Sequence, residues 1–209
     1  VAQNNNARKA AARAFAVASL SGATFKVVYR HNLIKLKKGS YLMEAETKKA
    51  ALRMIPYGIY VLTAKASDGK ISAATVNWVT QTSFDPPLVA IGVKADSGIY
   101  QNLKVGSSFA LNFLGKGQQG AAFTFFKPAQ LEDGMISGEA YREGSTGSPI
   151  LESAPACVEF NVAEIVKLGD HHIVVGEVVG IHQSNAPEGR ADEAILEMKD
   201  LGNNVFYGG

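Results

Sequence analysis

Cysteine is nearly absent from this sequence: Cys157 is the only one among 209 residues. A single thiol cannot form an internal disulfide and cannot build a metal cluster alone, so a reducing, cytoplasmic compartment is favoured. Long apolar runs are missing as well. No stretch reaches the roughly 18 apolar residues that a transmembrane helix needs, and no membrane span is predicted.

Two catalytic signatures are also missing, namely Gly-x-Ser-x-Gly and the P-loop. Cys157 begins an apolar strand with no nearby base, so nucleophilic catalysis through its thiol is disfavoured. His171 and His172 are adjacent but have no cysteine or further ligand at metal-binding spacing, which predicts no metal site. His31 and His182 have no evident partner.

Acidic residues are scarce in the first quarter of the chain. Residues 1–55 hold eleven Lys or Arg against Glu44 and Glu46, whereas the chain as a whole carries only +2. Such an asymmetry concerns docking, solubility or partners and not the fold. Nucleic acid is disfavoured as a partner because aromatic residues are not interleaved with the basic ones.

The N-terminal segment predicts an extension and not part of a core. The sequence begins at Val1, and residues 7–20 are rich in Ala and Arg without acids, which favours a helix. A linker from a longer protein is favoured over a transit peptide. We therefore expect a basic linker over residues 1–47 and a separate domain over 48–209. Residues 24–36 have the composition of a strand, and 44–55 that of a short amphipathic helix ended by Pro56.

Strand patterns dominate from Tyr57 onwards. Only two short helices are expected between them, from Ser97 to about Val105 and over 118–127, with a surface loop over 134–148. The predicted fold class is therefore mainly β with short helices. We expect an antiparallel barrel, because closing the sheet hides most of its strand edges. The expected strands are 58–66, 70–84, 87–95, 108–115, 157–168 and 173–183, the last two being antiparallel partners.

The predicted strand 70–84 carries the most unusual pattern. Thr75, Asn77, Thr80, Gln81, Thr82 and Ser83 form a run of neutral hydrogen-bonding groups beside the small Ala73 and Ala74. Small residues let a flat ligand approach the backbone, and uncharged polar groups match a heterocycle edge or a polyol chain. A half-exposed strand in which threonine simply favours β structure is an equal alternative.

Three further positions are candidate contacts. Lys94 and Ser97 follow a buried strand at an expected helix start and could bind a phosphate, although Asp96 opposes this and an ordinary N-cap is the favoured alternative. His171 lies at a hairpin where a barrel pocket opens, with a solvated turn histidine as the alternative. Trp78 is expected in the core or an interface.

Taken in order, these segments resemble the flavin reductase-like FMN-binding family over about residues 48–207. The stretches that carry this resemblance are TVNW together with TSFDPPLV, and GDHHIVVGEVV. More narrowly, the sequence resembles the C-terminal module of cyanobacterial flavodiiron proteins. The resemblance implies a split antiparallel β-barrel that forms a homodimer and holds FMN, or FAD, near the dimer interface, with NAD(P)H as co-substrate.

The resemblance also implies site residues. Ala74, Thr75, Val76 and Asn77 would border the flavin ring and ribityl chain; Gln81, Thr82 and Ser83 would contact the ring or its edge; Lys94 to Ser97 would lie at the phosphate; and His171 would lie near the nicotinamide. The sequence departs from the family at Ala73, Trp78, Ala95 and Asp96. A carboxylate at the phosphate predicts weaker flavin binding.

Three functions follow from these expectations. The leading one is an NAD(P)H:flavin oxidoreductase that passes electrons to flavodoxin-like and di-iron domains of a longer chain. The second is a flavin-binding electron relay fed by a protein donor, which the basic N-terminal segment motivates. The third is a dimerising barrel without catalysis that has lost tight flavin binding.

Overall fold

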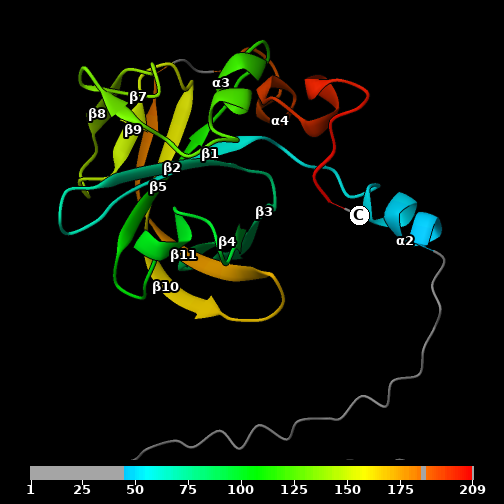
Figure 1. The fold of residues 1–209 in the computed structure, drawn as a ribbon, viewed down its shortest axis with the longest axis horizontal. Helices are drawn as coiled ribbons and strands as arrows, with labels where there is room; N and C mark the ends of the chain where they lie inside the picture. Colours follow the sequence, from blue (N-terminus) through cyan, green and yellow to red (C-terminus); the bar gives the residue numbers. More distant parts are fainter. Residues whose placement is uncertain (1–44, 185–186, 209) are drawn as a thin grey trace, which may run out of the picture. The chain divides into compact units, whose positions relative to one another are not determined.

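A curved, seven-stranded antiparallel sheet forms the body of the protein (Figure 1). The computed structural model describes residues 45–184 and 187–208, all within one compact unit. The strand order is β2-β1-β5-β10-β11-β4-β3, and every pairing is antiparallel. The strands are β1 (Tyr60–Lys65), β2 (Ile71–Val76), β3 (Val79–Phe84), β4 (Pro87–Lys94), β5 (Ser108–Phe113), β10 (Ala156–Val166) and β11 (His171–Gln183).

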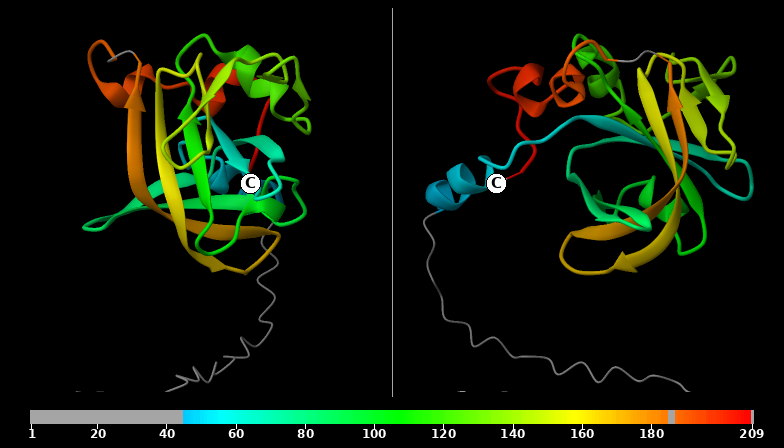
Figure 2. Two further views of the ribbon diagram at one scale, coloured as in Figure 1. Left: turned by 90° about the vertical axis from the view of Figure 1, so that its left-hand side faces the viewer. Right: turned by 180° about the vertical axis from the view of Figure 1, so that it is seen from behind.

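Short elements precede, connect and follow these strands. They form two small hairpins and a few short helices, and Figure 2 shows the long strands β10 and β11 curving through the body. The predicted mainly β, split-barrel architecture is confirmed. The short elements are α2 (Ala45–Leu52), α3 (Gln119–Thr124), α4 (Ala191–Ala194), the 3-10 helices η1 (Tyr100–Asn102) and η2 (Met198–Leu201), and the strands β6 (Leu131–Glu132), β7 (Met135–Ile136), β8 (Tyr141–Glu143) and β9 (Pro149–Leu151).

The core has two layers, one on each side of β1. Leu62 belongs to a cluster inside the curved sheet, where Phe109 and Phe160 stack with ring centroids 4.9 Å apart. Val61 points the other way, into a second cluster that includes residues of α3. Because alternate residues of a strand face opposite sides, a strand buried on both faces is apolar throughout. This explains the apolar run 60–62 at the start of β1.

Gly176 shows how tightly the inner layer is packed. A Cβ atom at this position would lie 2.7 Å from the Phe109 ring and 2.9 Å from that of Phe160. Glycine is a poor strand residue, but here it makes room for the stacked pair. The strand β11 therefore tolerates glycine at the point where two aromatic rings face it.

The predicted strand 70–84 is wrong in one respect: it is two strands, and they lie at opposite edges of the sheet. The break falls at Asn77 and Trp78. The Val79 N–H donates to the Asn77 carbonyl at 3.1 Å, and the Gly92 N–H donates to the Trp78 carbonyl at 2.8 Å. These bonds end the pairing with β1 and begin the pairing with β4, so the polar run turns a corner.

The predicted helix from Ser97 to Val105 is also wrong, since only the 3-10 turn Tyr100–Asn102 forms there. Its cap is Ile99, although the Ser97 hydroxyl does accept the Tyr100 N–H at 3.4 Å. A turn at Gly106, whose φ is +84°, leads the chain into β5 before a longer helix can form. The predicted loop 134–148 contains β7 and β8.

Other predictions agree with the structure. The helices expected at 44–55 and 118–127 appear as the shorter α2 and α3, and the hairpin of strands 157–168 and 173–183 is β10 with β11. The elements expected at 7–20 and 24–36 lie outside the described residues. The division of the chain at residue 47 stays a prediction.

Candidate functional site

A cavity of about 470 Å³ opens where β2 and β4 end and β11 begins, closed on other sides by the end of α3 and by the C-terminal segment. Its lining is largely apolar with a few convergent polar groups, which is the usual character of a small-molecule site. Seven of the ten predicted site residues line it: Ala74, Thr75, Val76, Asn77, Lys94, Ser97 and His171.

The other three predicted residues, Gln81, Thr82 and Ser83, do not line this cavity. They lie on β3, where Gln81 Nε2 donates to the Ser83 carbonyl at 3.1 Å and Thr82 Oγ1 donates to the Leu88 carbonyl at 3.4 Å. The break at Asn77 and Trp78 carries them to the other edge of the sheet. Their role in binding stays a prediction.

Thr75 and Asn77 form the polar wall. The Thr75 N–H donates to the Phe125 carbonyl at 3.1 Å, and its hydroxyl donates to the Ala122 carbonyl at 2.7 Å. These two bonds tie the edge of β2 to α3. Asn77 is buried, and its side-chain amide donates to the Tyr207 carbonyl at 3.0 Å. Neither side chain lies in bulk solvent, and both adjoin the cavity.

Lys94 and Ser97 form the exposed rim. The Ser97 hydroxyl donates to the Lys94 carbonyl at 2.7 Å, which closes a tight turn after β4. Lys94 Nζ lies 3.1 Å from the carboxylate of Asp96, and this hydrogen bond raises the pKa of Lys94. Asp96 itself does not line the cavity. The rim therefore offers a hydroxyl and an ammonium group, and the ammonium group is also paired with Asp96.

His171 begins β11 and is held from three sides. Its Nδ1 lies 3.0 Å from Asp170, its Nε2 lies 2.7 Å from the Tyr207 hydroxyl, and its ring packs on Trp78 with centroids 4.5 Å apart. The bond to His171 lowers the pKa of Asp170. The Trp78 indole N–H is buried and has no hydrogen-bond partner within the described part of the chain.

Sequence reasoning missed the walls contributed by distant segments. Phe125 and Phe126 come from the end of α3, and Val205, Phe206 and Tyr207 come from the C-terminal segment. No spacing rule connects these positions to β2. The only available signal was the aromatic pair Phe206-Tyr207 in an otherwise small and polar tail.

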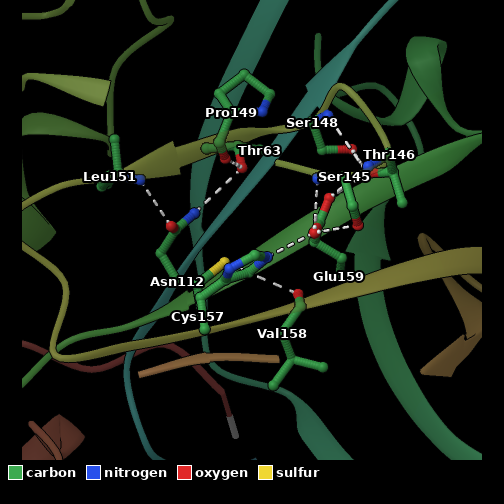
Figure 3. Close-up of polar contacts among 11 residues, drawn as sticks. Thr63, Asn112, Ser145, Thr146, Ser148, Pro149, Leu151, Cys157, Val158 and Glu159 are labelled. Atoms are coloured by element: carbon green, nitrogen blue, oxygen red, sulfur yellow. Dashed lines mark hydrogen bonds and ion pairs between the residues drawn. The ribbon is translucent and has the colours of Figure 1, made fainter. Parts of the chain in front are cut away.

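A second polar cluster surrounds Glu159, a completely buried carboxylate on β10 (Figure 3). It accepts hydrogen bonds from the backbone and hydroxyl groups of both Ser145 and Thr146 at 2.5–3.0 Å. His182 Nε2 lies 2.6 Å from the same carboxylate, so the expectation that His182 has no partner is wrong. The bonds hold the loop before β9 against the sheet.

Cys157 is buried, and burial raises the pKa of its thiol to about 12. Because the thiolate is the reactive form, we expect almost no reaction with a disulfide reagent at pH 8 in the native protein. Denaturation should release one reactive thiol, measured by absorbance of the released leaving group. Rapid labelling of the folded protein would contradict the prediction.

Residues 45–184 and 187–208 contain no cluster of three or more His, Cys, Asp or Glu arranged to hold a metal ion. None of the helices in these residues is long and apolar enough to cross a membrane.

Comparison with known proteins agrees with the geometry. Residues 52–198 match the model of the flavin reductase like domain. The chain belongs to this flavin reductase-like family. A flavin reductase from Pseudomonas putida is 33% identical over 130 residues, covering 62% of this chain and 75% of that protein. These matches confirm the predicted resemblance.

Two further proteins are similar to this chain. Diflavin flavoprotein A 1 of Synechocystis sp. is 34% identical over 150 residues, which are 70% of this chain but only 26% of that protein. The solved NADH:FAD oxidoreductase of Streptomyces globisporus C-1027, in complex with NAD and FAD fragments, has a TM-score of 0.54 at 30% identity. That match covers 62% of this chain and 76% of the other.

Proposed function

We propose that the chain is an NAD(P)H-dependent flavin oxidoreductase that binds FMN, with FAD as the alternative flavin. The observation that carries the proposal is the cavity in which Thr75 and Asn77 of the polar corner meet His171. Its relatives include a flavin reductase and an NADH:FAD oxidoreductase. No carboxylate lines the cavity among the described residues, and this suits a ligand with a neutral ring edge and an anionic phosphate.

The residues of the cavity suit three parts of a flavin, namely the ring, the ribityl chain and the phosphate. Ala74, Thr75, Val76 and Asn77 would border the ring and the ribityl chain, because they combine a small side chain with uncharged polar groups. Lys94 and Ser97 would hold the phosphate at the rim through an ammonium and a hydroxyl. Bound flavin would supply the hydride acceptor.

His171 would orient the nicotinamide. Its ring is fixed by Asp170 and packed on Trp78, and its Nε2 bonds the Tyr207 hydroxyl, which also lines the cavity. A positioned hydrogen-bonding group lowers the entropic cost of the reactive geometry. No protein nucleophile is required.

The test is a titration followed by a reduction. Adding FMN to the purified chain should quench flavin fluorescence to saturation, and stopped-flow mixing with NADPH or NADH should then bleach the bound flavin rapidly. Tight flavin binding without bleaching would favour a relay fed by a protein donor. Absence of flavin binding would favour a barrel without catalysis, and either result would overturn the proposal.

We also propose that the electrons pass to flavodoxin-like and di-iron domains of a longer, cytoplasmic protein. The match to about a quarter of a diflavin flavoprotein supports this. Oxygen consumption driven by NAD(P)H should then require both this chain and those domains. Equal consumption with this chain alone would contradict the proposal.

A homodimer is proposed on the exposed face of β11. Ile173, Val179 and Ile181 are exposed there at alternating positions, and such apolar strips mark interfaces. Ile181→Asp is expected to shift the protein from dimer to monomer in light scattering coupled to size-exclusion chromatography. Val105→Asp, at an exposed position after η1, serves as the control and should leave the dimer intact. An unchanged dimer in Ile181→Asp would exclude this face.

A further inference from the structure

Tyr207 contacts the polar and aromatic groups that converge on the candidate site. Its carbonyl accepts the Asn77 amide at 3.0 Å, and its hydroxyl lies 2.7 Å from His171 Nε2. Its ring lies 5.7 Å from that of Trp78. This residue, far in sequence from all three, thus lines the cavity and contacts Asn77 and His171 of its wall.

Phe206 also lines a second cavity, of about 350 Å³. The two cavities share Met198, Val205, Phe206 and Tyr207 as a common wall. The guanidinium of Arg53 lies 3.9 Å from the centre of the Phe206 ring, and its Nε donates to the Gly208 carbonyl at 3.3 Å. The second cavity is therefore capped by an aromatic ring stacked on a cation.

We propose that the segment Val205–Gly208 occupies the nicotinamide-nucleotide site and is displaced when the dinucleotide binds. The inference rests on the proposed function. Tyr207 stands where a planar ring with an amide edge would meet Asn77, Trp78 and His171. Phe206 stands where a second ring would stack on Arg53, as guanidinium groups do on aromatic faces.

The charges around the second cavity suit the phosphates of such a ligand. Arg53 and Lys199 line it, and Glu197 is the one carboxylate among the described lining residues. Glu197 is already paired with Lys199 at 2.6 Å and with Lys116 at 3.2 Å. The cationic groups therefore exceed the anionic one.

The segment is only partly buried. About half of the Phe206 and Tyr207 surfaces is exposed, and the segment contains no helix or strand. A ligand that binds only the open form has its apparent dissociation constant raised by the inverse of the open fraction. If the segment is closed in about nine molecules of ten, removing the closed form should tighten nucleotide binding about tenfold.

Trp78 provides a direct readout, because it is the only tryptophan in the chain. We would titrate the full chain, without flavin, with NAD⁺ and with NADP⁺ and follow tryptophan fluorescence. Tyr207→Ser should lower the dissociation constant about tenfold, and Phe206→Ser should lower it by a smaller factor. Phe84→Ser, at an equally aromatic but fully exposed position on β3, is the matched control and should behave as wild type.

Hydrogen exchange supplies a second readout on the wild-type chain, where saturating nucleotide should raise the exchange of the peptide covering residues 203–208. Unchanged or weaker nucleotide binding in Tyr207→Ser, or absence of binding in both proteins, would overturn the proposal. If wild type binds FMN and is reduced by NAD(P)H while Tyr207→Ser binds nucleotide no better, the inference alone fails. If wild type neither binds FMN nor is reduced, the proposed function fails.

Discussion

Replacing Glu159 with alanine is expected to lower the free energy of unfolding by about 3–5 kcal/mol, because it removes the acceptor of a buried charged network. Ser145 and Thr146 each contribute two donors to this carboxylate, and His182 contributes a further contact. Without it, the Ser145 and Thr146 N–H groups and the Ser145 hydroxyl would lose this acceptor, which is costly, while the Thr146 hydroxyl would keep its contact with Ser148. Urea denaturation followed by far-UV circular dichroism measures the change.

Glu164→Ala is the matched control for this experiment. Glu164 lies on the same strand, but it is exposed and its carboxylate accepts only the neighbouring Ile165 N–H. Its replacement should change stability by no more than about 0.5 kcal/mol. Equal effects of the two substitutions would show that the buried network adds nothing to stability.

The same network predicts how stability depends on pH. Hydrogen bonds from Thr146, with those from His182 and Ser145, outweigh burial and lower the pKa of Glu159 from 4.5 to about 2. A carboxyl with a lowered pKa stabilises the fold fully above its unfolded value and loses that contribution as the pH falls towards the folded value. Wild type should therefore lose about 3 kcal/mol from this group between pH 4.5 and pH 2, and Glu159→Gln should lack that component.

His171→Ala is expected to lower the rate of flavin reduction by NAD(P)H about tenfold or more, with less than a threefold change in the FMN dissociation constant. The imidazole lines the cavity beside Tyr207, whereas the proposed flavin contacts come from β2 and from the rim after β4. Stopped-flow reduction and fluorescence titration separate the two quantities.

His172→Ala controls for the loss of a neighbouring imidazole. His172 packs edge-on against Tyr100 and bonds its hydroxyl at 2.6 Å, away from the residues that line the cavity. It should reduce flavin at a rate close to wild type. The role assigned to His171 is excluded if its alanine variant retains full reduction kinetics, or if it loses flavin affinity as much as rate.

The architecture followed from local patterns. Apolar runs bounded by turn residues located β1, β4, β5, β10 and β11, and these are the signals that depend only on neighbouring residues. The antiparallel pair β10 and β11 was predictable because a four-residue turn joins two long strands. Most of the polar cavity wall was found because neutral polar groups on an otherwise buried strand are unusual.

What stayed hidden depends on contacts between distant segments. Side chains alternate between two faces with a period of two residues in both β2 and β3. The sequence pattern therefore does not mark the break between Val76 and Val79. Glu159 and His182 meet only through the register of β10 and β11, which two irregularities shift. The approach of Tyr207 to Asn77 spans 130 positions and has no local signature.

The break at Asn77 and Trp78 has a mechanical consequence. The two outermost strands of the sheet are consecutive in the chain, so a link of two residues joins its opposite margins. Each residue extends at most about 3.6 Å, so this link limits how far the margins can separate. We expect one residue inserted there to widen the mouth of the cavity and to keep every backbone hydrogen bond between the paired strands. An insertion between Ser67 and Lys70 would only lengthen a surface turn.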